Sequence, residues 1–281
     1  MSIIINNNVA SLIAQRNLNK NTSNLTKSIE KLSSGYRINR ASDDAAGLSI
    51  SEALRGQIRG NKQAIGNVQD GINLLQIAES GLTVINENLQ RIRELCIQAA
   101  NDTNGSVERT SILAELNARI DDITRIAKSA KFNNISVLDG TATSTKLQVG
   151  ANSTVSTNTI DVASVLTDTQ SSTIGVTIAI TGGAWTSTLI RSYLGVIDSA
   201  ITAISTKRSN IGALQNRLES TLENLTVMNE NIQASESRIR DLDIAKETAN
   251  MVKNQILQQA SASVLSQANQ IPQLALSLLR S

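Results

Sequence analysis

Across its 281 residues the sequence contains no histidine, one cysteine (Cys96), one proline (Pro272) and very few aromatic residues. Without histidine, the most common general base and the most common metal ligand are both missing. A single cysteine excludes an internal disulfide. Because aromatic side chains are scarce, burial has to come from Leu, Ile, Val and Ala, which typically fill helix–helix seams. A nearly proline-free chain can also keep long helices unbroken.

Strong charge of one sign is also missing. The 26 basic and 24 acidic residues are interspersed and give a net charge of +2, so we expect no nucleic-acid binding. No apolar run approaches the roughly 18 residues that would span a bilayer, so we expect no membrane insertion. The segment MSIIINNNVASLIAQRN has neither a basic start nor a long apolar stretch, and it does not resemble a cleavable secretory signal.

What is present is helical periodicity in the first and last parts of the chain. The clearest predicted helix covers about residues 67–100, where apolar residues recur in steps of three and four. A second predicted helix covers about residues 106–129, with Asp102 or Ser106 as candidate cap. A third apolar stripe starts at Ile211, and its polar gap at Ser235 and Glu236 could be a break or a register shift. The stripe predicted for residues 67–100 consists of Val68, Ile72, Leu75, Ala78, Leu82, Ile85, Leu89, Ile92, Cys96 and Ala99.

Both chain ends carry shorter stripes that we expect to mediate assembly. The first helix should end at Ser34-Gly35, and Ser42 with Asp43 and Asp44 should start the next one. The expected assembly residues are Leu18, Leu25, Ile29 and Leu32 near one end, and Ile256, Ala260, Val264, Leu274 and Leu278 near the other. A helix with a narrow apolar stripe needs a partner, and head-to-tail contacts that do not close produce helical filaments.

The middle, about residues 135–188, is rich in Thr, Ser, Gly and Val and predicts short β-hairpins. One hairpin should turn at Gly150-Ala151-Asn152, and a further strand-like run, TIGVTIAIT, ends before Trp185, which we interpret as a packing residue. The predicted fold is therefore mainly α, a long coiled-coil helical rod formed by both chain ends with a small β-hairpin region in the middle.

Nothing in the sequence predicts a catalytic residue, a cofactor site or a metal site. The carboxylate pairs Asp43/Asp44 and Asp121/Asp122 are neighbours on predicted helices, where adjacent side chains point about 100° apart. Helix capping or solvation explains them better than catalysis. Cys96 stands in stripe register, so we interpret it as a small buried apolar residue.

Several motifs resemble those of bacterial flagellins. LSSGYRINRASDDAAGLSIS, at residues 32–51, resembles the N-terminal signature, and NLQRIRELCIQAAN and FNNISVLDG resemble the segments that follow it. ASESRIRDLDIAKE and NQILQQASASVLSQANQIPQLALSLL resemble the C-terminal signature. The resemblance covers roughly the first 160 and the last 90 residues, and a two-ended pattern of this kind is specific.

The resemblance implies a subunit that self-assembles into an extracellular flagellar filament used for motility, and no enzyme. Residues 1–40 and 241–281 would form the inner coiled coil, and residues 41–240 a helical rod with hairpins at about 135–188. The middle is short, so large outer domains should be missing. We also expect the isolated monomer to have disordered ends that become helical on polymerisation.

The resemblance also implies partners. They are other copies of the chain, a flagellar type III export apparatus with its chaperone, and filament cap and hook-junction proteins. A host Toll-like receptor would contact Arg91, Leu95 and Glu115, although solvated helix charges also explain Arg91 and Glu115. The alternatives are a hook–filament junction protein of the same family, a hydrolase with a site in the middle zone, and a soluble coiled-coil adaptor. The histidine-based metalloprotease form of the hydrolase is excluded because the sequence has no histidine.

Overall fold

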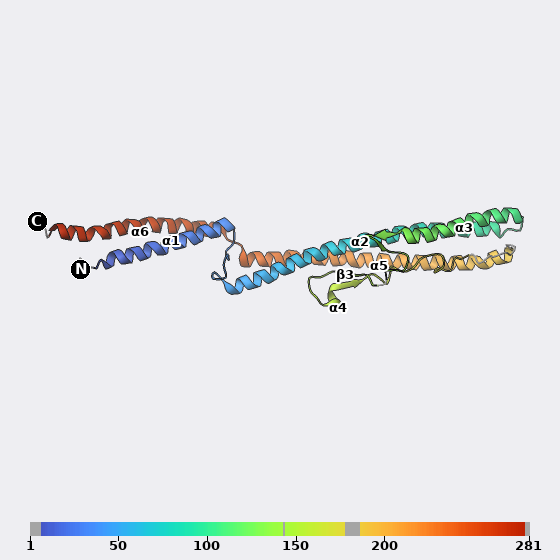
Figure 1. The fold of residues 1–281 in the computed structure, drawn as a ribbon, viewed down its shortest axis with the longest axis horizontal. Helices are drawn as coiled ribbons and strands as arrows, with labels where there is room; N and C mark the ends of the chain where they lie inside the picture. The colour runs from blue at the N-terminus through green and yellow to red at the C-terminus, as the bar shows by residue number, and fades with distance from the viewer. Residues whose placement is uncertain (1–6, 143, 178–185, 279–281) are drawn as a thin grey trace. The chain divides into compact units, whose positions relative to one another are not determined.

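A computed structural model describes residues 7–142, 144–177 and 186–278, with side chains described up to residue 270. The described chain is mainly helical, with small β-hairpins in the middle, as predicted (Figure 1). It divides into one unit made of Met1–Gly56 with Asn231–Ser281, and a second made of Gln57–Glu230. Among the described helices, none is long and apolar enough to cross a membrane.

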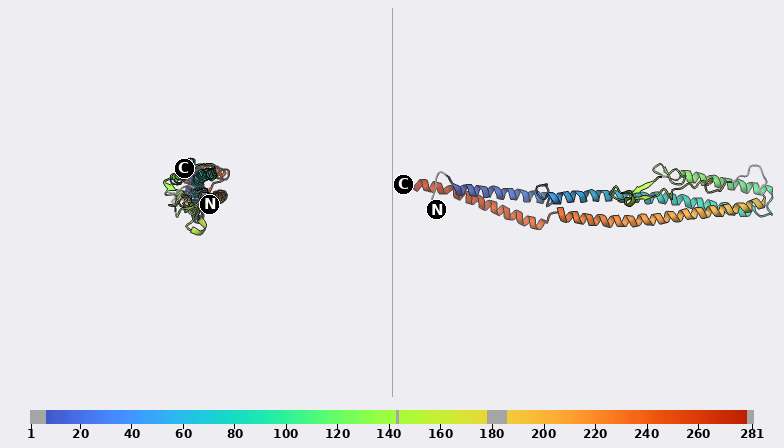
Figure 2. Two further views of the ribbon diagram at one scale, coloured as in Figure 1. Left: turned by 90° about the vertical axis from the view of Figure 1, so that its right-hand side faces the viewer. Right: turned by 90° about the horizontal axis from the view of Figure 1, so that it is seen from below.

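The second unit has a core between three of its helices, α2 (Ala45–Ala99), α3 (Ser106–Ser129) and α5 (Ser187–Arg240). Figures 1 and 2 show α3 and α5 running along α2. The ten residues of the stripe predicted for residues 67–100 are all buried, with exposures of 0–6%. The steps of three and four therefore identified the buried face of α2 correctly, because they keep one side of a helix turned towards its neighbours.

Three predictions about helix ends need correction. α2 begins at Ala45 and continues without a break into the segment predicted as a separate helix, and its cap is Asp44, whose Oδ1 accepts from the Gly47 N–H at 2.9 Å, not Ser42. α3 has Gly105 at its cap and no side-chain cap bond. Asp102 pairs instead with Arg109 at 3.1 Å.

The polar gap at Ser235 and Glu236 is not a break, because α5 continues to Arg240 and α6 (Ile244–Leu278) begins just after it. A break would leave backbone N–H and C=O groups without their helical partners, and Ser235 instead donates its hydroxyl to the Asn231 carbonyl at 2.8 Å within the continuing helix.

The middle forms two antiparallel hairpins. β1 (Lys131–Phe132) pairs with β2 (Ile135–Ser136) around Asn133 and Asn134, whose positive φ angles of 44° and 67° suit a tight hairpin turn. β3 (Lys146–Gln148) pairs with β4 (Thr159–Asp161), in the region predicted to form a hairpin. The connection is longer than the predicted turn and contains a short helix, α4 (Val155–Asn158).

The further strand-like run is not a strand over its described residues 173–177, which form a turn and irregular backbone; the rest of it, and Trp185, lie outside the described residues.

Glycines on α2 let the hairpin region approach closely. A Cβ at Gly60 would lie 2.7 Å from Ala151 Cβ, and one at Gly81 would lie 2.6 Å from Leu138 Cδ1. Real Cβ atoms do not approach this closely, so Gly60 is needed to seat Ala151 on the helix, whereas at Gly81 a Cβ would require only the end of the Leu138 side chain to move. The space is taken by Ala151 at the tip of β3–β4 and by Leu138 after β2.

Removing part of the α2 stripe should unfold the second unit more easily. Leu89→Ala, at a fully buried position, should lower the free energy of unfolding by about 2–5 kcal/mol. Ile97→Ala on the same helix, where the side chain is 51% exposed, should change it by less than about 1 kcal/mol. Urea denaturation followed by circular dichroism measures both, and equal losses would contradict this account of the core.

Candidate assembly interface

The two chain ends pair as helices within the first unit. α1 (Val9–Ser34) and α6 lie side by side in Figures 1 and 2, with the start of α1 and the last turns of α6 at the same end of the pair. Among the buried and half-buried positions of the two helices, one series on each recurs in steps of four and three, the coiled-coil period. They are Ala14, Leu18, Asn21, Leu25, Ser28 and Leu32 on α1, and Met251, Asn254, Gln258, Ser261, Leu265 and Ala268 on α6.

Seven of these twelve seam positions are polar or small, and hydrogen bonds connect the helices across the seam. Asn21 Nδ2 donates to Ser261 Oγ at 2.8 Å and to the Leu257 carbonyl at 3.3 Å. Asn8 Nδ2 donates to the Ala268 carbonyl at 2.8 Å. Gln258 Nε2 donates to Thr22 Oγ1 at 3.1 Å. Polar groups at such positions fix the register of a helix pair at some cost in stability.

Much of the apolar surface of these helices points away from the seam. Ile256 is 59% exposed and Val264 56% exposed on α6, and Leu12 is 63% exposed on α1. Val252 and Ala260, which stand in the same i, i+4 row as Ile256 and Val264, are exposed as well. The terminal pair therefore leaves an outward row of apolar residues without a partner in the described chain.

The assembly residues predicted from the sequence divide into two groups. Leu18, Leu25 and Leu32 are half-buried and face the seam, whereas Ile29 is 50% exposed. Ile256, Ala260 and Val264 are exposed and do not face α1. The side chains of Leu274 and Leu278 lie outside the described residues.

The connector after α1 brings the two sequence signatures together. Gly35 ends α1, as predicted, with φ of 74°, and its carbonyl accepts from the Leu242 N–H at 3.0 Å. The Arg37 N–H donates to the Arg240 carbonyl at 2.7 Å. The guanidinium of Arg240 lies 4.7 Å from the centroid of the Tyr36 ring, a cation–π contact.

Charged and buried groups complete this junction. Arg240 Nη1 lies 2.7 Å from Glu52 Oε1, and this hydrogen bond is the main reason that the pKa of Glu52 lies below its usual value. Hydrogen bonds from the Arg40 and Asn39 amides lower the pKa of Asp43, against the opposing effect of burial. Ile38, only 1% exposed, fills the interior of the connector. Polar residues of both sequence signatures therefore join the end of α1, the start of α2 and the end of α5 at one junction.

Of the predicted receptor contacts, the structure places Arg91 and Glu115 together. Arg91, on α2, lies 3.1 Å from Glu115 Oε1 on α3 and 3.0 Å from Glu94 Oε2, and the hydrogen bonds to Glu94 and Glu115 raise its pKa. Both side chains of the Arg91–Glu115 pair are partly exposed, at 45% and 42%. Leu95 is only 1% exposed and belongs to the core, so it is not available as a surface contact.

Cys96 is fully buried, in agreement with its interpretation as a small apolar residue, and burial raises the pKa of its thiol to about 12. Such a thiol stays protonated at neutral pH and is a poor nucleophile. No group of three or more His, Cys, Asp or Glu residues that could hold a metal ion occurs among the residues whose positions are described.

Sequence reasoning missed the polar half of the terminal seam. The signal was available, because Ala14, Asn21 and Ser28 recur every seven residues, three or four positions away from Leu18, Leu25 and Leu32. A search for apolar stripes passes over such positions. The hydrogen-bond partners on α6 follow only from the pairing of two segments that are more than 200 residues apart.

Comparisons with known proteins fit this geometry. Residues 5–143 match the bacterial flagellin N-terminal helical region, and residues 194–279 match the bacterial flagellin C-terminal helical region. The chain is 44% identical to flagellin from Halalkalibacterium halodurans, over 99% of this chain and 100% of that protein. It is also 44% identical to flagellin from Bacillus subtilis, over 98% of this chain and 99% of that one.

One solved structure resembles the chain in fold alone. It is a putative flagellar hook-associated protein from Vibrio parahaemolyticus, with a TM-score of 0.58 and 14% identity, and the match covers 71% of this chain and all of that one.

Two glycines test whether the connector between α1 and α2 depends on the left-handed backbone conformation of Gly35. An added Cβ meets nothing within 4 Å at either Gly35 or Gly56, but only Gly35 has a positive φ. Gly35→Ala should therefore destabilise the terminal pair by about 1 kcal/mol, while Gly56→Ala, in the interior of α2, should stabilise the chain by about as much. Thermal unfolding followed at 222 nm measures both; a shift of the same sign in both variants would contradict this account.

Proposed function

The chain belongs to the bacterial flagellins, the family of flagellar filament subunits, and we propose that the exposed apolar residues of α1 and α6 drive its assembly. The observation that carries the proposal is the row Val252, Ile256, Ala260 and Val264, which faces away from the polar seam. Exposed contiguous apolar surface marks interaction sites. A second copy that covers this row in a head-to-tail arrangement would expose its own row to a third copy, and the result is a fibre.

The remaining roles follow from the family. The polymer of identical copies works outside the cell in motility, and the chain is a structural protein and not an enzyme. We propose that the subunit is secreted through the flagellar type III apparatus, that an export chaperone covers its C-terminal helix, and that cap and hook-junction proteins contact the filament ends. Identity to flagellins over nearly the full length favours a filament subunit over the hook–filament junction protein.

The division of the polymer into layers is part of the same proposal. Residues 1–40 with 241–281 form the inner core, and residues 41–240 form the surrounding layer with its hairpins, without large outer domains. The support is that α1 pairs with α6, and that the connector between α1 and α2 packs against residues 239–242.

Polar substitutions in the exposed row test the assembly proposal. The double variant Ile256→Ser and Val264→Ser should raise the critical concentration for seeded polymerisation more than tenfold, because each buried aliphatic side chain contributes about 1.5–3 kcal/mol. The monomer should keep its unfolding midpoint, since both side chains are exposed in it. Sedimentation and negative-stain microscopy measure the polymer.

The matched control is Val107→Ser, where a valine at the start of α3 is 73% exposed. This variant should polymerise at the wild-type critical concentration. If the double variant polymerises as well as the control does, the exposed row does not drive assembly.

We also propose that the Arg91–Glu115 pair is recognised by a Toll-like receptor of the host. The two side chains join α2 to α3 while staying partly exposed, so their charges remain accessible to a partner. Arg91 also borders a cavity of 360 Å³ whose lining includes Asn88, Arg119 and Asp122. Leu95 would contribute only indirectly, by supporting the helix beneath Arg91.

Arg91→Ala should lower receptor activation at least tenfold without unfolding the chain, because a hydrogen-bonded charged contact contributes about 1.5–3 kcal/mol. Arg93→Ala is the matched control, since Arg93 also joins α2 to another helix, through a 2.7 Å contact with Asp198 on α5. A receptor reporter assay on monomers measures both. Equal activation by the wild type and both variants would refute recognition through Arg91.

A further inference from the structure

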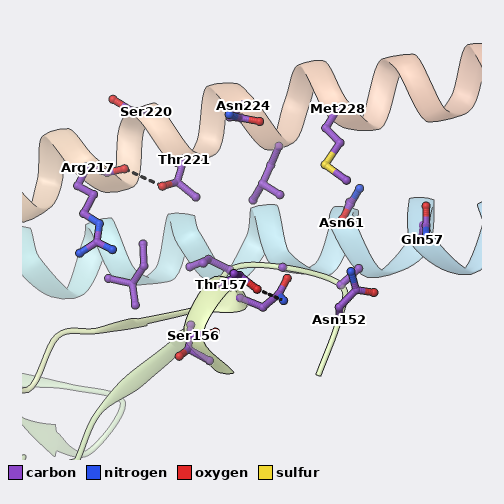
Figure 3. A pocket seen from close by; sticks show the side chains of 17 residues that line it. Gln57, Asn61, Asn152, Ser156, Thr157, Arg217, Ser220, Thr221, Asn224 and Met228 are labelled. Carbon is purple, nitrogen blue, oxygen red and sulfur yellow. Dashed lines mark hydrogen bonds between the residues drawn. The ribbon is translucent and has the colours of Figure 1, made fainter. Parts of the chain in front are cut away.

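A polar cavity of 460 Å³ lies between α2, α5 and the hairpin β3–β4. In Figure 3 its walls are Gln57 and Asn61 on α2, Arg217 to Met228 on α5, and the segment containing Asn152, Ser156 and Thr157. All of these residues belong to the second unit. Its volume falls in the range of sites that bind small molecules or several side chains, roughly 300–1,000 Å³.

One wall holds a buried donor without a partner. Asn61 is only 1% exposed, and its Nδ2 makes no hydrogen bond within the described part of the chain. Figure 3 shows this nitrogen pointing from α2 towards Met228 on α5. Buried polar groups are nearly always paired, and one that is not lowers stability. An acceptor that enters the cavity would pair it.

The charge of the lining selects the kind of acceptor. The exposed guanidinium of Arg217 has neither a hydrogen bond nor an ion pair in the described residues, and the cavity lining contains no Asp or Glu. A carboxylate accepts from both an amide and a guanidinium and forms the stronger, charge-assisted type of hydrogen bond with arginine. The lining therefore fits an anionic acceptor better than a neutral one.

The hairpin wall is held in place before anything binds. Gln148 Nε2 donates to the carbonyls of Gly150 and Asn152 at 2.8 and 2.9 Å, and Asn67 Nδ2 on α2 donates to the Gln148 carbonyl at 3.0 Å. Gly60 allows Ala151 to approach the helix. A site that is formed in advance loses less entropy on binding.

We propose that this cavity receives an acidic side chain and its adjoining backbone from a second copy of the chain during polymerisation. The proposal rests on the proposed function, which surrounds each copy with others. The chain supplies suitable groups, since Asp70, Glu219 and Glu223 are exposed and make no hydrogen bond or ion pair among the described residues. The cavity is also larger than one carboxylate needs, which fits a segment better than a lone ion.

Two variants test the proposal in the full-length chain. Asn61→Leu removes the unpaired donor at similar volume, so the urea midpoint of the monomer should stay the same or rise, while the critical concentration rises about tenfold. Arg217→Gln should also raise the critical concentration severalfold. Arg191→Gln on the same helix, where the side chain is 63% exposed, is the control and should polymerise like the wild type.

If both variants polymerise at the wild-type critical concentration, the proposal is wrong. A lower urea midpoint for Asn61→Leu would also overturn it, because it would show that the Asn61 amide already makes a hydrogen bond within the monomer. Titration with glutarate distinguishes the other source of a carboxylate. If glutarate stabilises the monomer through Asn61 and Arg217 while polymerisation is unaffected, the site binds a free carboxylate and not a second copy. If the wild type itself does not polymerise, the proposed function fails instead.

Discussion

Hydrogen bonds between small polar side chains set the pairing of the two chain ends but stabilise it only weakly, and much of the apolar surface of these helices remains exposed. Across the seam, Asn21 bonds Ser261 and Gln258 bonds Thr22. Each such bond contributes only about 0.5–1.5 kcal/mol net. In the second unit, by contrast, apolar packing and not polar bonding joins the helices, because the α2 stripe is completely buried against α3 and α5. One unit thus has a closed core of its own, while the other leaves apolar surface exposed.

The sequence predicted the buried core of the second unit better than the pairing of α1 with α6. The α2 stripe, the end of α1 at Gly35 and the bounds of α3 follow from local periodicity and turn chemistry, which act within a few residues. The cap at Asp44 was missed, because neighbouring Ser and Asp residues compete as caps, and the continuity of α5 was left open, because polar residues interrupt an apolar pattern without interrupting a helix. The seam was missed because its polar positions have meaning only once α6 lies opposite.

The difference between local signals and contacts of distant segments also explains which candidate sites could be predicted from the sequence. Arg91 and Glu115 were identified through the family resemblance, and their ion pair between α2 and α3 is a property of the folded unit. The burial of Leu95 was also within reach, since Leu95 stands three residues after Ile92 and four before Ala99 of the predicted stripe. The cavity beside Asn61 joins residues from three separate segments, and an asparagine within a helical pattern gives no local signal of an unpaired donor.

The most direct test of the central claim is amide hydrogen exchange across α1 and α6 in the monomer and in the polymer. If the polar seam alone is too weak to hold the pair, these amides should exchange quickly in the monomer and become strongly protected in the polymer, while the amides of α2 near Leu89 stay protected in both. Equal, strong protection of α1 and α6 in the isolated monomer would show that the seam suffices by itself, and it would contradict the account.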